Sequence, residues 1–165
     1  RSVATEAGLE PSTLRHYFPS SEEMLAYTIA LVCSDQEVRL SAAEQTGNAR
    51  GSIRSAWLQA LPLDAARRTE THVWLAVTAV ARTENLRRVL AEINAGLDHL
   101  CQLTVRTYAP VADQDVEVRL LRAFTDGLAL NAVIDPAGFS PGRTREALDV
   151  YLQRLSALAS VGPRD

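Results

Sequence analysis

Between positions 12 and 17 the sequence places two hydroxyls, a guanidinium, an imidazole and a phenol on Ser12, Thr13, Arg15, His16 and Tyr17. Side chains of these types bind phosphate oxygens and base edges in the DNA major groove. A helix over 11–18 that turned its apolar residues inward would carry all five on or beside its exposed face. The pattern therefore fits a DNA-reading helix, and it equally fits a helical hairpin with an ordinary polar face.

The residues around this helix favour a helix-turn-helix. Ala4 offers a small side chain where a second helix crosses closely, and Gly8 accepts the positive φ that a tight turn needs. Leu14 is expected to point back into a small core with Leu9 and Phe18. Two short helices at a close crossing are thus predicted at the start of the chain.

A third helix begins directly after them. Ser20 and Glu23 form an S-x-x-E capping box, and Pro19 and Met24 can pack as a hydrophobic staple around the same helix start. If the preceding helix lay in a major groove, the backbone N–H groups and the positive dipole end at this cap would face a phosphate.

The stretch "TLRHYFPSSEEML", residues 13–25, closely resembles the end of the DNA-binding domain in the tetracycline-repressor (TetR) family of bacterial regulators. Two positions depart from the family pattern: Arg15 stands where many members have Tyr, and Ser21 stands where a Lys commonly contacts phosphate. The family has a complete helix before the segment that corresponds to 1–8, so we expect this first helix to be missing from the sequence or disordered. The resemblance implies DNA contacts from Ser12, Thr13, Arg15, His16, Tyr17, Ser20 and Ser21.

The whole chain is predicted to be all-α. Glycine and proline punctuate stretches of helical length, and no β-branched alternation bounded by turns indicates a strand. The expected helices span 1–8, 11–18, 20–46, 51–61, 64–81, 83–108, 114–134 and 142–160. We divide the chain into a DNA-binding helix-turn-helix remainder with the start of the connecting helix over 1–26, and an effector-binding and dimerisation domain over 27–165.

Two further stretches resemble the larger domain of the same family, "HVWLAVTAVARTENLRRVL" over 72–90 and "DGLALNAVIDP" over 126–136. The resemblance implies a ligand cavity between these helices. Tryptophan and phenylalanine suit apolar or cationic groups, whereas threonine, histidine and asparagine orient polar ones. The implied effector-binding residues are Trp57, Trp74, Thr78, His99, Phe124 and Asn131, each of which has an ordinary structural role as its alternative.

Apolar residues recur about every four positions on the last two long helices, for example at Val116, Leu120, Phe124 and Leu128. The resemblance implies that these helices form a four-helix bundle with their copies in a second subunit. A partner within the same chain would explain the same stripes. The interface residues expected for a homodimer are Leu120, Leu121, Leu128, Leu148, Leu152 and Leu155.

The net charge is −3, and all 17 basic residues are arginines. A DNA-binding surface must therefore be local rather than spread over the whole protein. The pairs Arg67–Arg68 and Arg87–Arg88 are interpreted as solvated helix faces.

No H-E-x-x-H zinc pair, G-x-S-x-G elbow or glycine-rich phosphate loop is present, so neither an enzyme nor a cofactor or metal site is expected. Cys33 and Cys101 match no metal or redox spacing, and no apolar run approaches the roughly 20 residues of a membrane span. We expect a cytoplasmic protein with no membrane partner.

The sequence thus predicts a ligand-responsive transcriptional regulator, most simply a repressor, that binds palindromic operator DNA as a dimer and is released by a small-molecule effector. Its rival is a helical effector-binding or protein-interaction dimer that has lost DNA binding. A generic helical bundle that carries the motif by chance is a third reading, opposed by the length of the match.

Overall fold

The computed structural model describes residues 2–43, 48–110 and 114–159, and these ranges are helical, with no strand among them. The predicted all-α class is confirmed. The helices are α1 Ser2–Glu6, α2 Pro11–Tyr17, α3 Ser21–Ala43, α4 Ala49–Ala60, α5 Ala65–Val80, α6 Glu84–Tyr108, α7 Gln114–Ile134 and α8 Pro141–Leu158. Their order and number in these ranges match the expected ones, and most ends agree within two residues. The predicted continuation of the third helix over 44–46, and residue 160 of the last, lie outside the described residues.

The turn after α1 has the geometry that its glycine predicts. Gly8 has φ 65°, and the N–H of Leu9 donates to the carbonyl of Ala4 at 2.8 Å while the N–H of Gly8 donates to Thr5 at 3.1 Å. This pair of bonds is a Schellman motif with glycine in the left-handed position. Ala4 is 1% exposed at the helix crossing, as expected, but the Leu9 side chain is 44% exposed rather than part of a small core.

Helix α2 is short, and the residue that follows it, Phe18, contacts α3. Its N-cap, Glu10, makes no side-chain capping bond, and Pro11 occupies the first turn, where a missing N–H costs nothing. After the helix ends, the Phe18 ring packs at a tilt on the ring of Tyr27, with 5.4 Å between centroids. Phe18 and Leu14 are half-buried.

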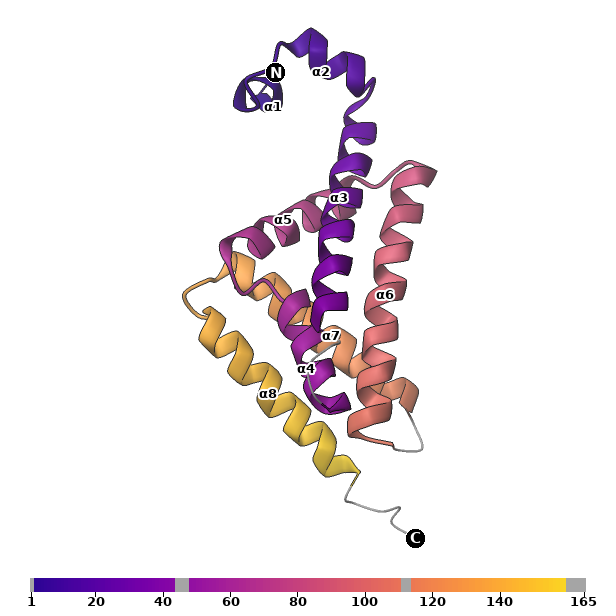
Figure 1. Cartoon of the computed structure of the whole chain (residues 1–165), viewed down its shortest axis with the longest axis vertical. Helices are drawn as coiled ribbons and strands as arrows, with labels where there is room; N and C mark the ends of the chain where they lie inside the picture. The colour runs from indigo at the N-terminus through magenta and orange to yellow at the C-terminus, as the bar shows by residue number, and fades with distance from the viewer. Residues whose placement is uncertain (1, 44–47, 111–113, 160–165) are drawn as a thin grey trace.

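Helix α3 joins the two short helices to the rest of the chain. Figure 1 shows α1 and α2 at one end of the molecule, with α3 running from them into the helical body. The Ser20 hydroxyl accepts a hydrogen bond from the Glu23 N–H at 3.1 Å, which is one of the two bonds of the predicted capping box. The domain boundary predicted between 26 and 27 falls inside this continuous helix, so a displacement of α3 would move the two short helices with it.

Two apolar clusters hold the body together. The first, which we call the α3–α5–α6 core, is built on Ala26, Ile29, Val77 and Leu86. The second, which we call the C-terminal core, joins α4, α6, α7 and α8 and is built on Ile53, Trp57, Leu61, Leu63, Cys101, Val105, Tyr108, Ala109, Leu121, Leu128, Leu148, Leu152 and Leu155. Helix α6 contributes to both clusters, so it ties the part of the body nearest α1 and α2 to the part furthest from them (Figure 1).

Candidate functional site: a polar helix face and an internal cavity

The side chains predicted to read DNA form one exposed surface on α2 and the start of α3. Ser12, Thr13, Arg15 and His16 are all exposed, and Tyr17 is 71% exposed. The His16 and Tyr17 rings meet edge to face with centroids 5.6 Å apart. Because Leu14 turns toward the interior, this face is free of large aliphatic side chains. We call these five residues, with Ser20 and Ser21, the polar face.

Ser20 and Ser21 extend the polar face to the start of α3, and both are exposed. The Ser20 hydroxyl oxygen accepts the Glu23 N–H, while its own proton stays available for another acceptor. The cap therefore places a hydroxyl beside the positive end of a long helix, where an anion is favoured.

A half-open cavity of about 90 Å³ lies between α3, α4, α5, α6 and α7. It exceeds by several-fold the roughly 10–15 Å³ that one water molecule occupies. Most of its wall is apolar, and residues of both cores contribute to it. The lining residues are Ile29, Val32, Cys33, Gln36, Trp57, Ala60, Leu61, Arg67, Glu70, Thr71, Trp74, Ile93, Leu97, Thr125, Asp126 and Ala129.

Two of the six predicted effector residues, Trp57 and Trp74, line this cavity. Trp57 is 1% exposed, and its Nε1–H donates to the hydroxyl of the fully buried Thr104 at 2.9 Å. The Trp74 Nε1 is also buried, but no acceptor lies within reach of it among the described residues. A buried donor without a partner costs about 1–3 kcal/mol, so this N–H is a natural anchor for an acceptor on a ligand.

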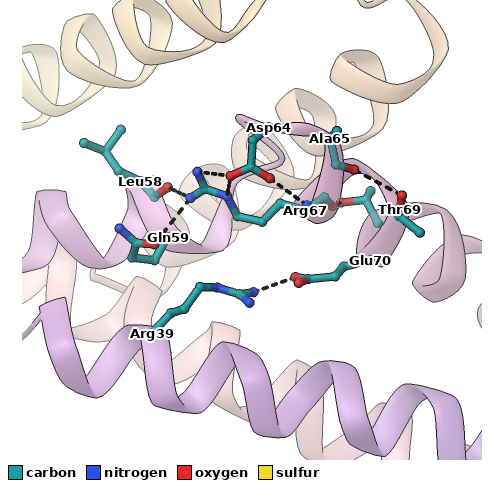
Figure 2. A network of polar contacts seen from close by, with 9 residues as sticks. Arg39, Leu58, Gln59, Asp64, Ala65, Arg67, Thr69 and Glu70 are labelled. Atoms are coloured by element: carbon teal, nitrogen blue, oxygen red, sulfur yellow. Dashed lines mark hydrogen bonds and ion pairs between the residues drawn. The ribbon is translucent and has the colours of Figure 1, made fainter.

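Arg67 on the cavity wall is held by bonds to three residues. Figure 2 shows its guanidinium between Asp64, the N-cap residue of α5, and the end of α4. Nε and Nη2 reach the Asp64 carboxylate at 2.9 and 2.7 Å, and Nη1 donates to the carbonyl of Leu58 and the side chain of Gln59. Bonds from the Arg67 backbone N–H and then its side chain lower the pKa of Asp64. The interpretation of Arg67 as a solvated residue was therefore wrong, because its side chain is only 14% exposed.

Glu70 is the second charged group of this wall, and it is bound differently. Its carboxylate accepts one hydrogen bond, from Arg39 Nη2 on α3, at 2.5 Å (Figure 2). The side chains of Arg39 and Glu70 are 28% and 20% exposed. The Arg39 Nε is buried and lacks a partner among the described residues. One bond therefore holds this ion pair across two helices.

Asp126 is the third charged group on the cavity wall. It accepts a bond from Arg122 Nε at 2.9 Å, and the same guanidinium also binds Asp98 and both the side chain and carbonyl of Asn94. If another group bound Asp126, Arg122 would keep its bonds to Asp98 and Asn94.

The other predicted effector residues lie outside the cavity. Thr78 is exposed and donates to the carbonyl of Trp74, Asn131 donates to the carbonyl of Gly127, and Phe124 stacks on Tyr151 with 4.3 Å between centroids. His99 is exposed at a groove of about 400 Å³ between α3 and α6 that adjoins the cavity, since Cys33, Gln36, Ile93 and Leu97 line both. Other residues of their helices, α5, α6 and α7, line the cavity, but these four side chains do not.

The residues that prediction missed follow a helical spacing on α5. Arg67, Glu70, Thr71 and Trp74 recur at intervals of three and four, so one face of the helix carries them all. Only Trp74 was predicted, because arginine and glutamate on a helix usually face water. Because Arg67, Glu70 and Thr71 lie seven, four and three residues before Trp74, their helical spacing from this tryptophan could have placed them on the same face.

Five of the six leucines predicted at the dimer interface lie in the C-terminal core of the chain itself. Leu121, Leu128, Leu148, Leu152 and Leu155 are between 0 and 4% exposed. These five leucines therefore pack within their own chain, as the alternative reading of the stripes had it, because α7 and α8 pack on each other and on α6. Only Leu120, at 52% exposed, is available to another molecule.

Both cysteines are free thiols at neutral pH. Burial raises the pKa of Cys101 to about 12. Burial, followed by the nearby carboxylates of Glu37 and Glu92, also raises the pKa of Cys33, which lines the cavity. Within the described ranges there is no group of His, Cys, Asp and Glu side chains that could hold a metal ion. None of the helices described is both long and apolar enough to cross a membrane.

Comparisons with known proteins bear on the function of this arrangement. Residues 49–157 match a TetR family model described as BetI-type transcriptional repressor, C-terminal. The chain is 28% identical to the HTH-type transcriptional regulator PksA of Bacillus subtilis (strain 168), over 94% of this chain and 78% of that protein.

Two solved structures have a similar fold. A transcriptional regulator from Rhodococcus sp. Rha1 is 31% identical with a TM-score of 0.77, over 99% of this chain and 87% of that one. A regulator from Saccharomonospora viridis, in complex with choline, is 22% identical with a TM-score of 0.75, over 92% of this chain and 82% of that one.

Proposed function

This chain belongs to the TetR family of transcriptional regulators, of the BetI type, and on that premise we propose that it is a dimeric, ligand-responsive repressor of palindromic operator DNA. The observation that carries the proposal is the double role of α3. Its start bears part of the polar face, and Ile29, Val32 and Gln36 further along it line the cavity. A ligand that changes the position of α3 therefore changes the position of the polar face.

The polar face is the proposed DNA-reading surface. Arg15 supplies a fork of donors for a guanine edge or a phosphate, and the neighbouring hydroxyls supply shorter contacts. The chain has no lysine, so Arg15 is the only side chain of the polar face with a permanent positive charge. We expect its loss to weaken both binding and the salt dependence of binding.

The cavity is the proposed effector site, and its chemistry favours a small organic cation. Two tryptophans line it, and indole faces attract cations. The ion pairs that reach its wall contain three arginines and four carboxylates: Arg39, Arg67 and Arg122 against Asp64, Glu70, Asp98 and Asp126. One negative charge is left over, which opposes an anionic ligand.

Choline is a suitable first probe for this site. It carries a quaternary ammonium for the indole faces and a hydroxyl oxygen for the unpartnered Nε1–H of Trp74. The regulator from Saccharomonospora viridis binds choline in the same fold, which supports the choice of probe.

The dimer interface is proposed on the side chains of α7 and α8 that remain exposed. Leu120, Leu130 and Ile134 on α7 are 40–65% exposed, and Val150 and Leu158 on α8 are 39% and 41% exposed. A twofold arrangement of these helices would bury such residues and present two polar faces to the half-sites of a palindrome.

The proposed function is tested by fluorescence anisotropy on DNA from upstream of the gene, using the protein as the gene encodes it. We compare wild type, Arg15→Ala and the matched control Arg106→Ala at two salt concentrations, with and without choline. Arg106 is exposed near the end of α6 that lies furthest from α2 (Figure 1). Wild type and Arg106→Ala should bind tightly and salt-sensitively, whereas Arg15→Ala should bind about tenfold or more weakly.

If the protein does not bind the upstream DNA, the same assay is repeated on fragments that cover the genome. If no fragment bound better than random DNA, the repressor function would be refuted, and a dimer that binds ligand or protein would be left. If Arg15→Ala and Arg106→Ala bound equally well, the polar face would not be the reading surface.

A further inference from the structure

The Arg39–Glu70 ion pair connects the cavity to the helix that carries the polar face. Glu70 lines the cavity from α5, whereas Arg39 reaches it from α3, 31 residues earlier in the chain. Among the described residues this is the one side-chain hydrogen bond that joins α3 to α5. Apolar packing in the α3–α5–α6 core supplies the remaining contact between the two helices.

Of the ion pairs around the cavity, Arg39–Glu70 is the easiest for a ligand to displace. Arg67 makes bonds to Asp64, Leu58 and Gln59, and Arg122 is anchored on α6 as well as on Asp126. Arg39 instead uses one nitrogen on one carboxylate oxygen, its Nε has no partner among the described residues, and its side chain already touches solvent. A released Arg39 guanidinium can therefore be hydrated without crossing the core.

We propose that Glu70 is a shared counter-ion: a cationic effector in the cavity takes its carboxylate from Arg39 and so releases α3 from α5. This inference rests on the proposed function and adds the residue pair that transmits the signal. The Arg39–Glu70 bond stabilises the DNA-binding position of α3. Effector and Arg39 compete for one carboxylate, so each must weaken the binding of the other.

The competition predicts opposite effects from its two members. Arg39→Gln removes the competitor, so choline should bind about tenfold more tightly, and ligand-free DNA binding should weaken. Glu70→Gln removes the counter-ion, so choline should bind about tenfold more weakly. A merely structural role would shift choline affinity in the same direction in both variants, because both would disturb the same wall.

The experiment is isothermal titration of wild type, Arg39→Gln and Glu70→Gln with choline and with its neutral isostere dimethylbutanol, in which carbon replaces the quaternary nitrogen. Arg87→Gln is the matched control, because it breaks an exposed α6 ion pair with Glu84, and neither residue lines the cavity or the groove beside it. Wild type should prefer choline, and this preference should collapse in Glu70→Gln. Arg87→Gln should behave as wild type.

DNA binding without ligand separates this inference from the proposed function. If wild type binds its operator and responds to choline, but Arg39→Gln has wild-type DNA affinity, the shared counter-ion is refuted while the repressor remains. The shared counter-ion is likewise refuted if both variants shift choline affinity in one direction. If wild type binds dimethylbutanol as well as choline, or neither compound, the cationic effector fails, and the inference fails with it.

Discussion

Replacing Leu148 by alanine tests whether the leucine stripe of α8 belongs to the chain's own core or to a subunit interface. Leu148 is 0% exposed inside the C-terminal core, whereas Leu120 on α7 is 52% exposed. Leu120→Ala is the matched control, since the chemical change is identical and only the burial differs.

The magnitude follows from this burial. The substitution removes three carbon groups worth about 0.8 kcal/mol each in transfer free energy, and the cavity left behind raises the total to about 3–5 kcal/mol. With an m-value of about 2 kcal/mol per molar urea, the unfolding midpoint should fall by about 1.5–2.5 M. Leu120→Ala should change the stability of a monomer by about 0.5 kcal/mol or less.

The assay is urea unfolding followed by circular dichroism at two protein concentrations tenfold apart, with sedimentation velocity on the folded samples. Leu148→Ala should lower the midpoint by the same amount at both concentrations, while Leu120→Ala should weaken self-association and make the midpoint less dependent on concentration than in wild type. If Leu148→Ala kept the wild-type midpoint at low concentration and only lost self-association, its assignment to the intrachain core would be refuted.

Further predictions concern the turn, the buried tryptophan and the buried thiol. Gly8→Ala meets no atom within 4 Å but must adopt φ 65°, so it should destabilise the α1–α2 turn by about 1–2 kcal/mol and weaken DNA binding. Gly96→Ala, inside α6 with equally open space, should instead stabilise the protein by about 0.5–1 kcal/mol in thermal unfolding. Thr104→Val deprives the Trp57 Nε1–H of its acceptor and should cost about 1–3 kcal/mol in urea unfolding, an effect that should shrink in a Trp57→Phe background. Because the folded-state pKa of Cys101 is raised from 9.0 to about 12, its contribution to stability should be constant below pH 9 and should be lost between pH 9 and 12, as the unfolded thiol ionises first. A Cys101→Ala variant that kept the same alkaline loss of stability would contradict this assignment.

Local features of the fold were predictable because neighbouring residues determine them. The left-handed glycine at position 8 and the serine cap at position 20 each depend on a few consecutive residues, and both were confirmed. Helical class and helix order followed from the spacing of apolar residues and of glycine and proline. The prediction that Leu9 is buried with Leu14 and Phe18 was wrong, because the burial of a side chain depends on the surface that packs against it and not on the turn that precedes it.

The sequence by itself determined the helices, their caps and turns, and the polar face on α2, since these depend on interactions within a few residues of chain. Only the tertiary structure decided which helices cover the leucine stripes, because an apolar stripe has the same period whether its partner lies in the same chain or in another. The same holds for Arg39 and Glu70, which read as ordinary surface charges until the packing of α3 on α5 brings them to 2.5 Å beside the cavity.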